Sequence, residues 1–200
     1  MLRWPLAMRF LPIILLVCVC AAAQQRPHPP LDVLHQGANE WGFQTGGGAA
    51  LPGGAGDRSY WMLTGRYSRI LTPELGSGPL RGNLQYGVEA TPVMVMRQST
   101  TVYAAGFSPL QLRYNFTARR RVVPYLEIGG SILGSTEQLP EGTSRFNFLT
   151  DGGIGVQVVR AHLPAIQAGM RYQHISNAGI ARRNPGINSL YFFGSMSWWK

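Results

Sequence analysis

One short stretch near the carboxyl end carries the residue types that nucleophilic catalysis needs. His174 and Ser176 are separated by a single residue. On an extended strand, alternate residues point to the same side, so these two side chains share a face. A histidine within reach of a serine hydroxyl can take its proton and make the oxygen a nucleophile. A His-x-Ser pair also occurs by chance at strand ends, so a purely structural interpretation stays open beside the catalytic one.

The residues that follow this pair extend the candidate site. Asn177 and the backbone at Ala178 and Gly179 are candidate hydrogen-bond donors for the oxyanion of a tetrahedral intermediate. Arg182 and Arg183 come next, and the planar guanidinium group suits phosphate oxygens. For these two arginines, a phosphate contact and a solvated turn are equally open interpretations.

The elements that must position these residues are β-strands. Eight runs are rich in aromatic and β-branched residues, show period-two alternation, and are separated by turn signals built from Gly, Pro, Asn and Asp. An even number of strands is what a single-chain bacterial outer-membrane barrel requires. The runs are approximately Glu40–Gly47, Ser59–Leu71, Asn83–Met96, Val102–Phe116, Val122–Leu133, Arg145–Val159, Ala165–Ser176 and Ile187–Trp199.

The alternation within the runs indicates which face meets lipid. In the last run, Leu190, Phe192 and Trp198 share one face, whereas Ser195 and Ser197 lie on the other. A membrane barrel turns its apolar face to lipid and its polar face inward, which is the reverse of a soluble barrel. By the same alternation, His174 and Ser176 fall on the lipid side of their strand.

These patterns predict an all-β protein, an eight-stranded antiparallel up-and-down transmembrane β-barrel over residues 39–200. Arg66, Arg113, Glu89 and Glu127 lie within the runs, and in a narrow barrel such residues can pair across the lumen. The alternative is an exported soluble eight-stranded barrel of lipocalin type, whose interior would be apolar.

Composition and the amino terminus support export. Only 14% of the 200 residues are charged, against roughly 25% in soluble domains. A mean hydropathy of -0.03 and one long apolar run exclude a bundle of membrane helices. Residues 1–23 are predicted to be a signal peptide, with a membrane anchor as the alternative, and residues 24–38 an amino-terminal lead-in. Both cysteines, Cys18 and Cys20, lie in the signal, so the mature chain has no disulfide.

The net charge of +9 raises the question of a partner. Nucleic acid is disfavoured because the arginines are spread over a strand pattern that follows an export signal. Lipopolysaccharide carries phosphates at the bilayer surface and is the partner that an exported, arginine-rich barrel suggests. His35 and His162 have no Cys, His or carboxylate at ligand spacing, so the sequence predicts no metal site.

A family resemblance rests on the same carboxyl-terminal residues. The motif His174-x-Ser176-Asn177-Ala178-Gly179, followed by Asn184-x-Gly186-Ile187, resembles the outer-membrane lipid A 3-O-deacylase (PagL-like) family. The resemblance implies an exported eight-stranded barrel that hydrolyses a fatty acyl ester of lipid A without a metal or other cofactor. By position, it implies Ser176 as nucleophile, His174 as general base and Asn177 as oxyanion donor, with Gly179 allowing close backbone approach.

One position departs from that family. Where its catalytic motif has a glutamate after the Gly-Ile pair, this chain has Asn188. Asn188 shares the strand phase of Leu190 and Phe192, so we expect it to face His174 from the neighbouring strand. An amide oxygen can accept the imidazole N–H, as in Cys-His-Asn proteases, but it offers no negative charge to the imidazolium.

Two functional hypotheses follow. The first is an outer-membrane lipid A esterase that acts through Ser176 and His174, with lipid A and the surrounding outer-membrane lipids as partners. The second is a catalytically impaired or non-enzymatic outer-membrane barrel that binds lipopolysaccharide or is structural. The sequence leaves open which acyl chain is cleaved and whether the chain forms a homodimer.

Overall fold

The computed structural model describes residues 32–52, 58–119, 121–160 and 163–200. The predicted signal peptide and most of the lead-in lie outside the described residues. Among the residues described, no helix is long and apolar enough to cross a membrane.

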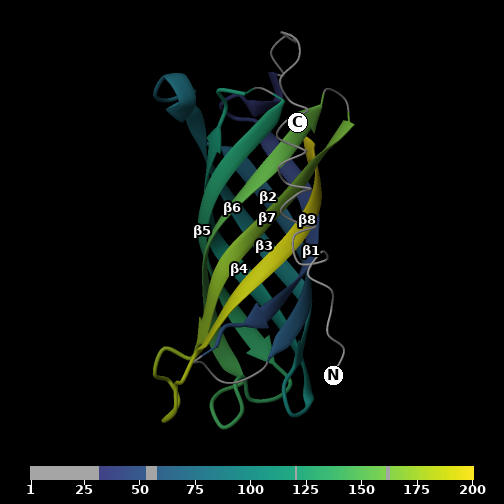
Figure 1. The fold of residues 1–200 in the computed structure, drawn as a ribbon, viewed down its shortest axis with the longest axis vertical. Helices are drawn as coiled ribbons and strands as arrows, with labels where there is room; N and C mark the ends of the chain where they lie inside the picture. Colours follow the sequence, from purple (N-terminus) through teal and green to yellow (C-terminus); the bar gives the residue numbers. More distant parts are fainter. Residues whose placement is uncertain (1–31, 53–57, 120, 161–162) are drawn as a thin grey trace, which may run out of the picture. The chain divides into compact units, whose positions relative to one another are not determined.

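The described chain forms a closed barrel in which each strand pairs with its neighbours in sequence, and β1 also pairs with β8 (Figure 1). All pairings are antiparallel, which is the up-and-down order that the sequence predicted. The strands are β1 (Asn39–Ala50), β2 (Ser59–Ile70), β3 (Gly82–Arg97), β4 (Thr101–Phe116), β5 (Val122–Ser135), β6 (Phe146–Arg160), β7 (Leu163–Ser176) and β8 (Ile187–Trp199), with short 3-10 turns η3 (Asp32–Leu34) and η4 (Gly78–Leu80).

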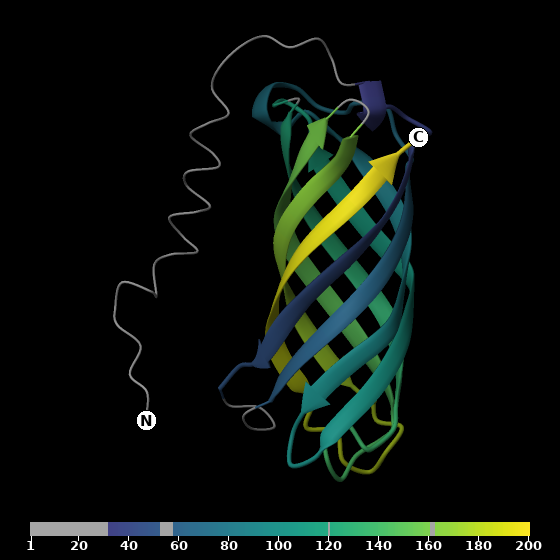
Figure 2. The ribbon, with the colours of Figure 1, turned by 90° about the vertical axis from the view of Figure 1, so that its right-hand side faces the viewer.

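The two ends of the barrel differ. The connections after β1, β3, β5 and β7 form one end, called the loop end below, and the carboxyl terminus lies at the other, the terminal end (Figures 1 and 2). Asn39 and Lys200 exchange two backbone hydrogen bonds at the terminal end, of 2.7 and 2.9 Å. The even strand number therefore brings the start and the finish of the barrel together.

The faces of the strands confirm the predicted orientation. Phe192, Ile128 and Ile154 project outward with more than half of their surface exposed. Polar residues such as Gln85 and Gln157 are fully buried in the lumen. A lipocalin-type barrel needs the opposite arrangement, so that alternative is wrong.

Side chains fill the lumen in three layers. At the terminal end, Leu34 of η3 packs with Val123 and Val159. In the middle, the charged residues within the strands form ion pairs, as predicted: Arg66, Arg113 and Arg171 surround Glu89 and Glu127, with the closest N–O distances at 2.8 Å. At the loop end, an apolar cluster closes the lumen; it includes Met62, Met94, Met96, Leu133, Leu149, Ile175, Ile187 and Tyr191. An eight-stranded barrel is just wide enough for such side-chain packing.

Candidate active site

His174 and Asn188 lie side by side on the lipid-facing wall of the barrel. Their Cα atoms are direct partners in the pairing of β7 with β8. His174 Nδ1 and Asn188 Oδ1 are 2.7 Å apart, and both side chains are half-buried. Because an amide oxygen can only accept, Nδ1 carries the proton and donates it. In a neutral imidazole with this tautomer, the opposite ring nitrogen, Nε2, has the free lone pair and can act as a base.

Ser176 ends β7 on the same face as His174. It is half-buried, and its partner across the pairing with β6 is Phe148. Alternate residues on a strand are about 7 Å apart along the chain, a span that an imidazole and a hydroxyl can bridge. Within the described residues, no hydrogen bond joins Ser176 to His174. The structure therefore brings His174 and Asn188 into contact and leaves Ser176 adjacent to them.

The turn that follows Ser176 is held by the side chain of Asn177, which is buried. Its Nδ2 donates to the carbonyl of Arg183 at 2.8 Å, and its Oδ1 accepts the Gly179 N–H at 2.9 Å. Its backbone N–H donates to Asn184 Oδ1 at 3.0 Å. These contacts organise the β7–β8 loop, residues 177–186, from inside.

The two predicted oxyanion donors are thus engaged in this loop. The Gly179 N–H is committed to Asn177, and the Asn177 amide is enclosed, so neither presents a donor group beside Ser176 here. The Ala178 N–H makes no hydrogen bond within the described part of the chain, and Ala178 is exposed. Ala178 also has a φ of 51°, an unusual backbone conformation for a residue other than glycine. Of the backbone donors considered from the sequence, Ala178 is the one left available.

Gly186, the glycine of the Asn184-x-Gly186-Ile187 motif, packs against the candidate site. Its φ is +67°, and a Cβ placed on it would lie 2.8 Å from His174 Cε1. The glycine backbone therefore packs against the imidazole ring, so only glycine fits without moving His174. The positive φ of Gly186 could not be predicted from the sequence because it depends on the path of the whole β7–β8 loop.

Arg182 and Arg183 are both exposed in the same loop. The Arg183 guanidinium lies close to Gly142 in the β5–β6 connection, because a Cβ built on that glycine would be 3.2 Å from Nη1. Both arginines thus sit at the loop end without a carboxylate partner among the described residues. They remain candidates for a phosphate contact.

The wall behind the site is tied to the barrel interior. Gln173 and Ser189 flank His174 and Asn188 in sequence but point inward, where both bond to the Tyr60 hydroxyl, at 2.5 and 2.9 Å. Because strands β7 and β8 are cross-linked to β2 in this way, the outward-facing pair rests on a fixed backbone. Among the described residues, no group of three or more His, Cys, Asp or Glu side chains could hold a metal ion.

The fold and these faces define a class: an outer-membrane β-barrel with a hydroxyl, an imidazole and an amide gathered on its lipid-facing wall. Comparison with known proteins narrows this class. The family model for lipid A 3-O-deacylase (PagL) matches residues 57–197. The chain belongs to this family, and its place is the bacterial outer membrane.

The individual proteins compared share less than 30% sequence identity with this chain. The lipid A deacylase PagL of Bordetella bronchiseptica is 28% identical over 186 residues, covering 88% of each chain. The crystal structure of the outer-membrane enzyme PagL has a TM-score of 0.58 at 19% identity, covering 78% of this chain and 97% of that one. Neisserial surface protein A has a TM-score of 0.51 at 17% identity, covering 81% and 96%. These two structural likenesses concern the fold alone.

Proposed function

We propose that this protein is an esterase that removes an acyl chain from an ester linkage of lipid A, the activity for which the lipid A 3-O-deacylase family is named. The observation that carries the proposal is the position of the His174–Asn188 pair beside Ser176, on the wall that faces lipid. An amphiphilic substrate can reach this wall sideways from the bilayer, with its acyl chains still in the membrane. A water-soluble ester would have to enter the hydrocarbon region of the membrane to reach the Ser176 hydroxyl.

The loop end faces the outside of the cell in this proposal. Outer-membrane barrels have short turns on the periplasmic side and longer loops outside. Three of the four connections at the loop end span 51–58, 136–145 and 177–186, whereas the terminal end has 117–121 and 161–162 beside the longer 71–81. Ser176 then lies near the outer surface, where lipopolysaccharide places its lipid A.

The chemistry follows from the tautomer of His174. As Ser176 Oγ attacks the ester carbonyl carbon, its proton passes to His174 Nε2, and a tetrahedral intermediate forms. Collapse of that intermediate breaks the ester bond, and His174 returns the proton to the sugar oxygen that leaves. Water, deprotonated by His174, then releases the fatty acid from Ser176. The Ala178 N–H is the donor that we assign to the oxyanion, in place of Asn177 and Gly179.

Asn188 orients the imidazole in this scheme. Its oxygen holds the proton on Nδ1 and so keeps Nε2 directed at the hydroxyl. Arg182 and Arg183, at the loop end, would engage the phosphates of the substrate. Because Asn188 brings no charge, we expect turnover below that of a site with a carboxylate at this position.

The test is mass analysis of lipid A from cells that express the chain. Loss of one hydroxyacyl group in the wild type, and its retention in Ser176→Ala, supports the esterase. Ser195→Ala, a strand serine of β8 far from the site, is the matched control. An unchanged lipid A pattern with all three proteins rejects the activity.

A second function is favoured by one observation, the neutral Asn188. In a non-enzymatic barrel that binds lipopolysaccharide, the His174–Asn188 pair would be retained without turnover. A fluorophosphonate probe separates the two functions, because an activated serine is labelled and an inert one is not. Labelling that is lost in Ser176→Ala indicates the enzyme; absence of labelling with intact lipid A indicates the binding protein.

A further inference from the structure

An apolar groove of about 570 Å³ lies in the wall formed by β3, β4 and β5, away from Ser176. This volume is within the range of small-molecule pockets, roughly 300–1,000 Å³. Its floor is made by Ala105 and Gly134, which are direct partners between β4 and β5. Val93, Tyr103 and Phe146 rise around that floor, and each is substantially exposed.

The groove has a structural cause. The pairing of β3 with β4 slips between Thr91 and Met94, so that Pro92 and Val93 together oppose Ala105. Such a bulge bends its strand away from the regular surface, and proline fits there because it has no N–H to donate. Beside the bulge, a methyl group and a glycine take the place of large lipid-facing side chains. The wall is therefore hollowed at this point.

The strand register links the groove to Ser176. One row of outward residues runs across the barrel as Phe107, Ile132, Phe148 and Ser176, each pairing with the next. The floor of the groove lies two residues farther along the strands than this row, toward the loop end. Ala105 is two residues from Phe107, and Gly134 is two residues from Ile132. Gly134 and Ser176 are two strands apart, about 10 Å across the sheet, and two residues apart along the strands, about 7 Å. The headgroup of a glycolipid with several acyl chains can bridge this separation and place one chain at each position.

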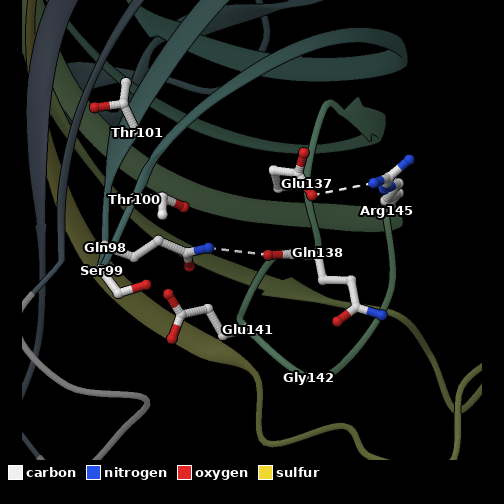
Figure 3. A pocket seen from close by; sticks show the side chains of 9 residues that line it. All are labelled: Gln98, Ser99, Thr100, Thr101, Glu137, Gln138, Glu141, Gly142 and Arg145. Atoms are coloured by element: carbon white, nitrogen blue, oxygen red, sulfur yellow. Dashed lines mark hydrogen bonds and ion pairs between the residues drawn. The ribbon is translucent and has the colours of Figure 1, made fainter.

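A polar pocket adjoins the groove at the loop end. It has a volume of about 770 Å³ and lies between the β3–β4 turn and the β5–β6 loop, with Gln98, Thr100 and Glu141 among its lining residues (Figure 3). Arg145 lines both cavities, is exposed, and pairs with Glu137 at 3.0 Å. Glu137 also lines this pocket, so its carboxylates and amides suit the hydroxyl groups of a sugar. An apolar groove beside such a pocket complements a glycolipid.

We propose that the groove over Ala105 and Gly134 holds a second acyl chain of the same lipid molecule whose ester lies at Ser176. The sugar then spans the ridge formed by Phe146 and Phe148, with its hydroxyl groups toward the polar pocket. This inference rests on the proposed esterase function and adds a specificity element to it. The groove selects lipids with several acyl chains, because a single-chain ester occupies the Ser176 side alone.

Gly134 offers a clean perturbation. A Cβ built on it meets no atom within 4 Å, and its φ is not in the left-handed region, so the wall accepts a side chain here. Gly134→Phe then places an aromatic ring in the groove. Gly65→Phe is the control. Gly65 lies on β2, three strands from both β5 and β7, and pairs with the outward-facing Phe43. A Cβ built on it comes no closer than 3.9 Å to another atom, and it does not line the groove.

The experiment compares lipid A with a p-nitrophenyl fatty acid ester as substrates. We expect Gly134→Phe to lower kcat/KM on lipid A about tenfold, the low end of what a misfit in an apolar pocket costs, and to leave the single-chain ester unchanged. Gly65→Phe should match the wild type on both. An unaltered rate on lipid A, or an equal loss on both substrates, overturns the inference.

Binding provides a readout that does not depend on turnover. In the Ser176→Ala background, retained lipid A is measured by native mass spectrometry of the barrel in detergent. Gly134→Phe should reduce the retained lipid about tenfold, and equal retention rejects the groove. If the wild type hydrolyses neither ester while the groove still governs retention, the esterase proposal fails and the binding site stands.

Discussion

The contact between His174 and Asn188 makes a sharp prediction about charge. Asn188→Asp replaces the amide NH2 by an oxygen of similar size and keeps the acceptor that lies 2.7 Å from Nδ1. The substitution therefore adds a negative charge next to the imidazole and changes little else. Because the imidazolium forms only as Ser176 attacks, the charge stabilises the transition state more than the resting state.

The size of the effect can be bounded from this geometry. Two unit charges about 4 Å apart attract by about 4 kcal/mol at an effective dielectric of about 20. A lowering of the barrel enzyme's activation free energy by that amount corresponds to about 10³ in rate. Because the pair is half-buried and partly screened, we expect about a 10²-fold increase in kcat for Asn188→Asp. In a serine protease, the reverse exchange lowers turnover about 10⁴-fold.

The assay is release of hydroxy fatty acid from lipid A under single-turnover conditions, with protein in excess. Asn188→Glu, whose side chain is one methylene longer, should also exceed the wild type. Asn188→Leu removes the acceptor and should fall below it. A folded Asn188→Asp protein whose rate stays within about twofold of the wild type would refute the reasoning, because the amide would then suffice as the partner of His174.

Three further predictions follow from other contacts. Gly186→Ala should displace the His174 ring and lower activity about 10²-fold, whereas Gly37→Ala, a left-handed glycine at the terminal end, should not; activity and thermal unfolding of both variants decide this. Glu127→Gln should destabilise the barrel by about 3–5 kcal/mol in urea unfolding, because three arginines lose their buried carboxylate; a loss below about 1 kcal/mol contradicts the ion network. Arg183→Ala should raise KM for phosphorylated lipid A about fivefold and leave KM for dephosphorylated lipid A unchanged; equal KM changes exclude a phosphate contact.

The barrel could be predicted from the sequence because alternation at period two is a local property. It fixed which side of each strand meets lipid, and hence that His174, Ser176 and Asn188 share a face. Strand phase placed Asn188 on the face of His174, whereas their direct pairing depends on the register between β7 and β8, which phase does not give. Strand limits were close, although β1 continues to Ala50, three residues beyond the predicted run, because its pairing with β8 extends to Ser189.

The loop and the groove could not be predicted in the same way. The hydrogen bonds of Asn177 depend on a loop that folds back so that Arg183 and Asn184 reach it. The groove depends on a slip of register at Pro92, which a strand pattern does not specify. Both features arise from the three-dimensional path of the backbone rather than from residue type.

The packed lumen has a consequence for the cell that carries this protein. A porin is also an outer-membrane β-barrel, but its water-filled channel admits small solutes, so each added copy raises the permeability of the outer membrane. In the described part of this barrel, the ion pairs and the apolar cluster at the loop end fill the lumen with side chains. Raising the copy number therefore changes the lipid chemistry of the surface without opening a route for antibiotics or nutrients.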